Sequence, residues 1–437
     1  MNDPAILYKQ ALEYERLSQI KQAMSAYSKI ICIDPDAKDA LHGYQRCIEL
    51  LPDAAQAYNQ LGISFARANR HQTADKCFER AIELNPNLAF AYNNRGLLQK
   101  SLGNYSTATK LYEQAVKLDP KYANAHWNMA LTLLLTGNFT RGWQEFTWRS
   151  QAKLDAILDS QKQNKTLWNG SPFRNKQLLI RYEQGFGDNI QCIRYIPEVK
   201  KLGGTVIVET HSLLMDLFKQ IPEIDVLTEA SADGTAQVEY DISAFIMDLP
   251  GIFKTTLNNI PADIPYLYAD IEKTNLWQKN LHENSFKIGI IWAGSPKHTN
   301  DMNRSCSLAL FEPLSQIPGI KLFSLQKGKA ADQLTQINWP VKNLAPKLYD
   351  FTDTAALIES LDLIISVDTA CLHLAGALGK PAWGIIPFVP DWRWLTERDS
   401  SPWYPSIRLF RQPQDHNWRV VFNQIAQQLK TLLFKNI

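Results

Sequence analysis

The stretch ISVDTACLHLAGALGKP, residues Ile365–Pro381, passes from an apolar, strand-like run into a run of small residues typical of a helix. Asp368 and Thr369 stand at the turn between the two, and His373 follows early in the helical run. In an open parallel sheet, ligands bind where strands end and helices begin. The stretch therefore predicts an α/β fold and directs attention to the residues that follow each strand.

Strand and helix alternate on both sides of this stretch. Strand-like runs occupy residues 286–294, 320–326, 361–367 and 380–387, and a closing helix is expected near residues 417–433. Helical patterns between the runs predict parallel strands joined by right-handed crossovers. Residues 271–437 are therefore expected to form one Rossmann-like half.

An earlier segment shows the same order. Strand-like runs at residues 176–183, 205–210 and 225–230 are separated by helical patterns, and a polar, proline-bearing stretch at residues 258–265 follows. Another polar stretch, residues 151–166, precedes them. We expect residues 151–270 to form a first Rossmann-like half, with a cleft between it and the second.

The first third of the chain has a different period. Pro52, Pro86 and Pro120 are 34 residues apart, a spacing that is typical of the tetratricopeptide repeat, a pair of antiparallel helices. Small and aromatic residues recur in two successive units: Gly62, Ala74 and Phe78, then Gly96, Ala108 and Tyr112. Residues 1–150 are therefore predicted to form a repeat solenoid, with a degenerate unit from Ala123. Only half a period separates Pro35 from Pro52, so one helix there is either extra or missing.

Asparagines recur on the first helices of these repeats. Asn59, Asn93, Asn94 and Asn128 stand at or beside equivalent positions. Solenoids present a concave face to peptides and proteins, and an amide side chain offers both a donor and an acceptor to a peptide backbone. A peptide-binding ladder is one hypothesis, and solvated or capping asparagine is the alternative.

Composition narrows the class of protein. With 46 Lys and Arg against 44 Asp and Glu, the formal charge of +2 gives no signal for nucleic acid or an anionic membrane. No uninterrupted apolar run reaches the roughly 18 residues of a membrane span, and no targeting segment is recognised, so a cytoplasmic location is expected. Six scattered cysteines without a C-x-x-C pair favour free thiols in a reducing compartment.

The first strand of the first half runs into EQGFGD, residues 183–188. Gly185 and Gly187 are expected to let the backbone turn tightly and approach a ligand. Ile190 replaces the third glycine of a dinucleotide fingerprint, and no P-loop motif occurs, so neither nucleotide site is favoured. Asp188 is interpreted either as a helix N-cap or as a catalytic carboxylate.

The second half offers polar residues at the corresponding places. Arg304 ends a long polar loop and is expected to precede a helix, where a phosphate meets a cation and a helix N-terminus together. Gln326 and Lys327 end the next strand. Thr369 is expected to cap the helix that carries His373, and Asp368 to accept hydrogen bonds from sugar hydroxyls. A capped structural helix remains the alternative.

Two further segments, PDWRW at residues 390–394 and SPWYP at residues 401–405, are unusually aromatic. Their rings either stack on a sugar or nucleobase or fill the protein core.

Taken together, EQGFGDNIQCIRYIP, SVDTACLHLAGALGKP and the loop ending in NRS resemble the heptosyltransferase-like glycosyltransferases of GT-B fold. The whole chain resembles bacterial proteins that join tetratricopeptide repeats to such a domain. In domain order it is also similar to O-linked N-acetylglucosamine transferase.

The resemblance implies inverting sugar transfer from a nucleotide-diphosphate sugar, with no metal and no cofactor. It implies that Asp188 is the general base, that Arg304 offsets diphosphate charge, and that the donor-binding corner is Asp368, Thr369, Ala370 and His373. Position at strand ends adds the remaining candidates for nucleotide-sugar binding: Gly185, Gly187, Gln326 and Lys327.

The expected partners are a nucleotide-diphosphate sugar, a protein or glycan acceptor, and a peptide or protein on the concave face of the repeats. Two rival hypotheses stay open. One is an interaction scaffold whose transferase-like domain binds a nucleotide sugar without turnover. The other is an epimerase of GT-B fold, although the sequence lacks a clear pair of carboxylates for it.

Overall fold

The computed structural model describes residues 3–51, 53–152, 166–261, 263–281 and 284–434. The chain divides into two compact units. One holds residues 1–133 and 145–154, and the other holds residues 134–144 and 155–437. The polar stretch predicted at residues 151–166 lies mostly outside the described residues, so the domain boundaries proposed from sequence stay predictions.

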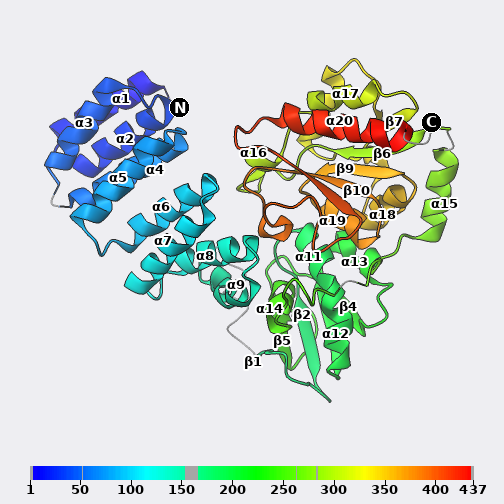
Figure 1. Cartoon of the computed structure of the whole chain (residues 1–437). Coiled ribbons are helices and arrows are strands. Elements are labelled where there is room, and N and C mark those ends of the chain that lie inside the picture. The colour runs from blue at the N-terminus through cyan, green and yellow to red at the C-terminus, as the bar shows by residue number, and fades with distance from the viewer. Residues whose placement is uncertain (1–2, 52, 153–165, 262, 282–283, 435–437) are drawn as a thin grey trace. The chain divides into compact units, whose positions relative to one another are not determined.

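The repeat region is helical throughout its described length (Figure 1). Its helices are α1 Pro4–Arg16, α2 Ile20–Ile33, α3 Lys38–Glu49, α4 Ala54–Arg67, α5 His71–Leu84, α6 Ala89–Ser101, α7 Tyr105–Leu118, α8 Ala123–Leu135 and α9 Phe139–Phe146. Helices α1 and α2, α4 and α5, and α6 and α7 pack as consecutive pairs. The predicted solenoid is confirmed.

Glycines bring the paired helices together. A Cβ atom added at Gly62 in α4 would lie 2.7 Å from the Phe78 ring of α5, and one at Gly96 in α6 would lie 2.6 Å from the Tyr112 ring of α7. These distances are too short for any side chain larger than hydrogen. The small residues predicted to allow close approach therefore do so, with an aromatic ring as the partner.

The structure also explains the half-period spacing between Pro35 and Pro52. Helix α3 stands alone between the α1–α2 pair and the α4–α5 pair, and it packs against α2. Gly43 in α3 lies directly against the Tyr27 ring of α2, as Gly62 does against Phe78. A single helix, without a second helix of its own repeat, accounts for the 17-residue spacing.

The asparagines form a chain of side-chain hydrogen bonds. Asn94 Nδ2 donates to Asn59 Oδ1 at 3.0 Å, and Asn128 Nδ2 donates to Asn93 Oδ1 at 2.9 Å. A longer bond of 3.4 Å runs from Asn93 Nδ2 to Asn94 Oδ1. The amides thus link successive repeats to one another, and binding of a peptide to them stays a prediction.

The first half of the α/β unit contains a five-stranded sheet in the order β1-β5-β2-β3-β4. Every pair of neighbouring strands is parallel. The strands are β1 Thr166–Leu167, β2 Gln177–Arg181, β3 Thr205–Thr210, β4 Val226–Glu229 and β5 Ile242–Phe245. The helices are α11 Phe186–Cys192, α12 Ile196–Lys201, α13 Ser212–Phe218 and α14 Leu249–Ile252.

The second half contains a six-stranded sheet in the order β11-β10-β9-β6-β7-β8, again parallel throughout. The strands are β6 Phe286–Ile291, β7 Ile320–Ser324, β8 Lys342–Asn343, β9 Leu363–Val367, β10 Ala382–Ile386 and β11 Ile407–Arg411. The helices are α15 Ile271–Asn280, α16 Asp301–Arg304, α17 Glu312–Ser315, α18 Phe351–Glu359, α19 Ala370–Ala377 and α20 Trp418–Phe434.

Helices cover both faces of this second sheet (Figure 1). On one face, Ile290 and Ile365 of the central strands pack with Phe311 and with Phe422 of α20 in one apolar core. Helices α18 and α19 lie on the other face. Because both faces are covered, the strands read as apolar runs, which is why β6, β7, β9 and β10 were predictable from sequence. The predicted GT-B architecture of two Rossmann-like halves is confirmed.

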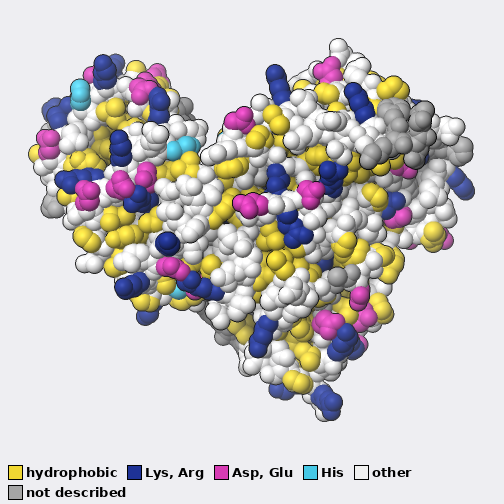
Figure 2. Space-filling view, in the orientation of Figure 1, with side chains coloured by type: hydrophobic (Ala, Val, Ile, Leu, Met, Phe, Trp, Pro, Cys, Tyr) yellow, Lys and Arg dark blue, Asp and Glu magenta, His cyan; other side chains and the backbone are white. Residues whose placement is uncertain are grey.

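The charged side chains, the helix lengths and the cysteines can be compared with what the composition predicted. Figure 2 shows Lys and Arg side chains interspersed with Asp and Glu on the face that it draws. Within the ranges that the structure describes, no helix is both long enough and apolar enough to cross a membrane. All six cysteines are free thiols, and Cys47, Cys77 and Cys192 are buried.

Candidate active site

The first-half motif begins with a left-handed turn at Gln184. Its φ of 60° is in the region that favours glycine, whereas Gly185, the N-cap of α11, has an extended backbone with a φ of −90°. The prediction that the two glycines supply the tight turn is therefore wrong. A non-glycine residue in this conformation costs about 1–2 kcal/mol, and such strain is common at functional sites.

Asp188 is the third residue of α11. Its Oδ2 accepts a hydrogen bond of 2.8 Å from the backbone N–H of Gly185. The N-cap alternative was wrong in detail, because Gly185 is the N-cap and Asp188 satisfies its amide from one turn inside the helix. The acid side chain is thereby fixed at the start of α11, where the helix dipole favours negative charge.

Gly187 brings the two halves into contact. A Cβ atom added there would lie 2.8 Å from His373 Cδ2 and 3.5 Å from Ala370 Cα, both in α19 of the second half. Helices α11 and α19 therefore pack directly against each other. Where a cleft was expected between the halves, the two motif helices touch at this point.

Replacing Gly187 with alanine should push the two motifs apart. The new methyl group would overlap His373, whose ring cannot retreat freely because its Nδ1 is bonded to the Tyr404 hydroxyl at 2.9 Å. Overpacking of this kind costs about 1–3 kcal/mol, so we expect a lower denaturant midpoint in chemical unfolding of G187A. A matched control is Gly319→Ala, where no atom lies within 4 Å of the added Cβ although the φ of 83° adds backbone strain. Loss of stability in G319A alone would contradict the close contact at Gly187.

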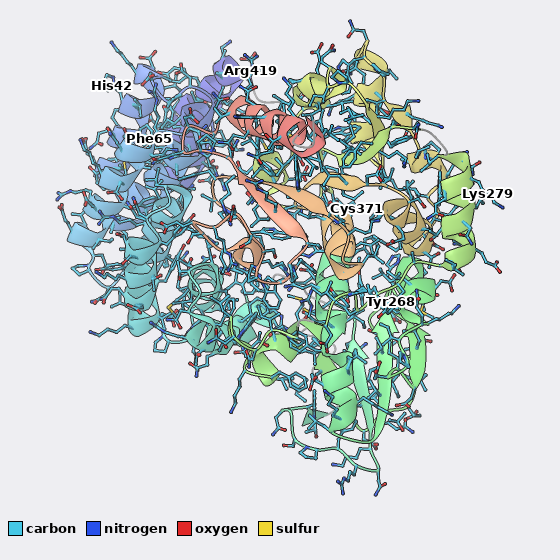
Figure 3. The ribbon with its side chains drawn as sticks, turned by 45° about the vertical axis from the view of Figure 1, so that its right-hand side comes forward. His42, Phe65, Tyr268, Lys279, Cys371 and Arg419 are labelled. Atoms are coloured by element: carbon cyan, nitrogen blue, oxygen red, sulfur yellow. The ribbon has the colours of Figure 1, made fainter. Side chains whose placement is uncertain are left out.

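The second-half motif surrounds the start of α19. Thr369 occupies the N-cap position, but its hydroxyl bonds to Ser366 Oγ at 2.9 Å and makes no cap to the helix. The predicted capping role is wrong because the nearer hydroxyl of the preceding strand takes the bond. Among the described residues, no acceptor meets the backbone N–H groups of Ala370 and Cys371. Figure 3 labels Cys371 at this first turn of α19.

Asp368 and His373 face each other at this corner. His373 Nε2 lies 3.7 Å from Asp368 Oδ1, and both side chains are largely buried. Arg304 Nη1 donates to the backbone carbonyl of Asp368 at 3.2 Å. Burial raises the pKa of Asp368, but hydrogen bonding to His373 and the charges of His373 and Arg304 outweigh it, so the carboxyl pKa lies below its ordinary value. The predicted donor corner therefore brings Arg304, Asp368 and His373 together, with Arg304 bonded to the Asp368 backbone and His373 facing the Asp368 carboxylate.

The polar loop that follows β6 packs beside Asp368 through Arg304. Arg304 Nε bonds to Asp301 Oδ1 at 3.2 Å, and Ser305 Oγ joins the same oxygen at 3.0 Å. The helical run predicted from Ser307 begins as a 3-10 turn at Leu308, with Ser307 as its N-cap, and Arg304 itself ends the short helix α16. Arg304 therefore adjoins α19 instead of a helix N-terminus of its own.

His298 lies in the same loop. Its pKa is lowered by burial and by the positive charge of Arg304, while the carboxylates of Asp368, Asp391 and Asp188 act in the opposite direction.

Gln326 and Lys327 lie just after the end of β7, and the side chain of each is hydrogen-bonded within the protein. Gln326 Oε1 accepts from the backbone of Trp292 and Ala293 at 3.1 and 2.9 Å, and its Nε2 donates to Ala293 O. Lys327 Nζ donates to Leu348 O at 2.6 Å. Gln326 fixes the start of the polar loop, and contact of either side chain with a donor stays a prediction.

A segment of the second half, residues 391–404, crosses to the first half; we call it the crossing segment. From it, Arg393 Nη2 donates to Asp188 Oδ1. Arg194 of the first half donates to Trp403 O at 2.9 Å, and its guanidinium lies 4.8 Å from the centre of the Tyr404 ring. Sequence reasoning gave no role to Arg393 or Arg194, since Asp188 and Arg393 are 205 positions apart and no local pattern links them.

The aromatic rings of the crossing segment are buried. Trp392, Trp394, Trp403 and Tyr404 are all at most 3% exposed. Trp143 packs edge-on against Trp392, with ring centres 5.2 Å apart. Of the two alternatives for PDWRW and SPWYP, core packing is confirmed. Within the described part of the chain, no group of three or more His, Cys, Asp or Glu side chains is arranged to hold a metal ion.

Two regions of the chain match known protein families. Residues 314–388, which include β9 and the start of α19, match the model for glycosyltransferase family 9 (heptosyltransferase). Residues 55–88, 77–110 and 100–137 match models of tetratricopeptide repeats. The chain therefore joins a region that matches tetratricopeptide repeats to a region that matches a heptosyltransferase family model. The architecture inferred from the sequence motifs is thereby confirmed.

One curated protein and two solved structures are similar to the chain over different extents. Protein FlbA of Caulobacter vibrioides is 25% identical over 287 residues, which cover 60% of this chain and 48% of FlbA, so the chain spans about half the length of this curated relative. A glycosyl transferase family 9 structure from Veillonella parvula covers 60% of this chain and 98% of its own, at 10% identity and a TM-score of 0.44. An O-GlcNAc transferase from Thermobaculum terrenum covers 98% of this chain and 91% of its own, at 12% identity and a TM-score of 0.31.

Proposed function

We propose that this glycosyltransferase domain transfers a sugar from a nucleotide-diphosphate sugar to a hydroxyl acceptor, with inversion and without a metal, in the cytoplasm. The observation that carries the proposal is the contact between Gly187 and His373. It joins a carboxylate motif of one half to a cationic, helix-start motif of the other. A transferase requires such a pair, because a proton must leave the acceptor while charge develops on the leaving group.

The leaving group is assigned to the second-half motif. The diphosphate departs with the electron pair of the broken C1–O bond and is met by the Arg304 guanidinium and by the backbone N–H groups at the start of α19. Both interactions strengthen as negative charge develops, so they stabilise the transition state more than the ground state. Asp368 and His373 then contact hydroxyl or phosphate groups of the donor.

The acceptor is assigned to the first-half motif. Its hydroxyl oxygen forms the new bond to C1 on the face opposite the leaving group, and its proton passes to Asp188. Attack from the opposite face gives inversion. The repeats supply a recognition surface for the acceptor protein or for another partner, consistent with the use of solenoid faces elsewhere.

Donor binding is the first experiment. We expect UDP, GDP or ADP, or a sugar ester of one of them, to raise the Tm of the full chain. Ligand at about 100 times its Kd adds about 2.7 kcal/mol of stability, which corresponds to a few degrees in differential scanning fluorimetry. The matching nucleoside without phosphate should give a much smaller shift. Equal shifts with nucleoside and nucleoside diphosphate, or none with either, would count against a diphosphate site at α19.

A further inference from the structure

One charged side chain of the second half is buried against the first-half motif. Arg393 lies in a single 3-10 turn, Trp392–Trp394, within the crossing segment, and its side chain is 7% exposed. The guanidinium has three partners. Nη2 donates to Asp188, Nε donates to Gln191 Oε1 at 2.5 Å, and Nη1 donates to Asp391 Oδ1 at 2.7 Å.

The arrangement suits arginine specifically. Asp188 and Gln191 are three residues apart and so share one face of α11, where a planar fork can meet both at once. Asp391 holds the opposite edge of the fork and also accepts from the backbone N–H of Arg393 at 3.1 Å. A lysine has one ammonium group and cannot reproduce this three-point contact.

The Arg393 guanidinium stays protonated although it is buried. Burial lowers the pKa of the guanidinium, but the negative charges of Asp391 and Asp188 outweigh burial and raise the pKa above its ordinary value. The fork is therefore a permanent cation, and its bonds to the two carboxylates are charge-assisted.

Asp188 is consequently held from two sides. Oδ2 accepts from Gly185 N–H, and Oδ1 accepts from Arg393. A carboxylate has about four lone-pair positions, so two bonds leave capacity for a further donor. The side chain is still 20% exposed. The carboxylate is thus fixed in direction while it remains accessible to an incoming hydroxyl.

We propose that Arg393 is a positioning residue for Asp188, which it aims at the acceptor hydroxyl from the opposite half. The inference rests on the proposed function, in which Asp188 takes the acceptor proton. Orientation of the base matters to the rate, because a displacement of about 1 Å can lower it about 10²-fold.

The test compares Arg393→Met with wild type in steady-state transfer assays. Methionine fills similar space without charge or donors. We expect kcat to fall about 10²-fold with the donor KM changed less than about threefold. Arg393→Lys keeps the charge but loses the fork and should recover only part of kcat. The matched control is Arg408→Met on β11, whose guanidinium bonds to Gln428 and lies over Phe410, and which should keep its kcat.

The outcomes separate this inference from the proposed function. If wild type transfers sugar and R393M keeps or exceeds its kcat, the positioning role is overturned while the function stands. A rise in donor KM with an unchanged kcat would also overturn it. If wild type releases no nucleoside diphosphate with any donor, the proposed function fails and the inference with it.

A second variant covers the case in which R393M does not fold. Gln191→Leu removes only the hydrogen bond that Gln191 accepts from Arg393 Nε. If both Gln191→Leu and R393K kept the wild-type kcat, Arg393 would not be a positioning residue for Asp188.

Discussion

Replacing Asp188 with asparagine is expected to slow sugar transfer about 10²–10⁴-fold while the donor Kd changes little. Asparagine has nearly the same shape, and its amide oxygen can still accept the bond that Gly185 N–H gives to Oδ2. It cannot take a proton from an acceptor hydroxyl. The loss should therefore appear in kcat, measured by release of nucleoside diphosphate, and not in donor affinity, measured by calorimetry.

The same half of the domain offers a matched control. Asp248 Oδ2 accepts from Phe245 N–H at 3.2 Å, the same one-turn contact that Asp188 makes with Gly185. Asp248→Asn should therefore reproduce the local structural effect without the catalytic one. If D188N and D248N retain equal activity, Asp188 is not the base. If D188N loses donor binding, the carboxylate serves the donor and the assignment of the two halves is reversed.

Replacing Asp368 with asparagine is expected to have the largest effect on stability. The carboxylate is buried beside His373, so its removal takes away the negative charge that faces the His373 ring. Arg304 bonds to the backbone carbonyl, which asparagine keeps. Breaking a buried pair from one side typically costs about 3–5 kcal/mol. Urea unfolding at pH 7 should show a difference near the lower figure, and the thermal shift with nucleoside diphosphate should shrink.

The difference between wild type and D368N should depend on pH. The pKa of Asp368 is lowered in the folded chain. The charged carboxylate therefore contributes stability above its unfolded value near 3.8, and this contribution is lost as pH falls through the lower folded value. The two unfolding curves should be furthest apart at neutral pH and converge in acid. A constant difference from pH 7 to pH 3 would contradict the ion-pair assignment.

Local apolar runs were sufficient to predict most of the α/β fold. Strands β3 and β6 were predicted from runs rich in Val and Ile, because strands that are buried on both sides have few polar positions to interrupt the pattern. Strand β5 is only four residues long, and β11 at the sheet edge alternates arginine with apolar residues, so neither gave a clear signal.

The site was less predictable than the fold. The motif residues Asp188 and His373 were recognisable because each follows a strand. The turn at Gln184 and the bond from Thr369 to Ser366 depend on backbone geometry that composition does not specify. The contact between Arg393 and Asp188 depends on how the two halves pack, and an arginine flanked by tryptophans carries no indication of a partner 205 positions away.

The fate of the sugar tests the central claim most directly. The wild-type chain would be given the nucleotide-diphosphate sugar that stabilises it most, together with peptide and glycan acceptors, and the products followed by NMR. We predict one nucleoside diphosphate released per acceptor glycosylated, with the anomeric configuration of the sugar inverted. A donor that is bound but unchanged, a donor isomerised without acceptor, or a product of retained configuration would contradict the account.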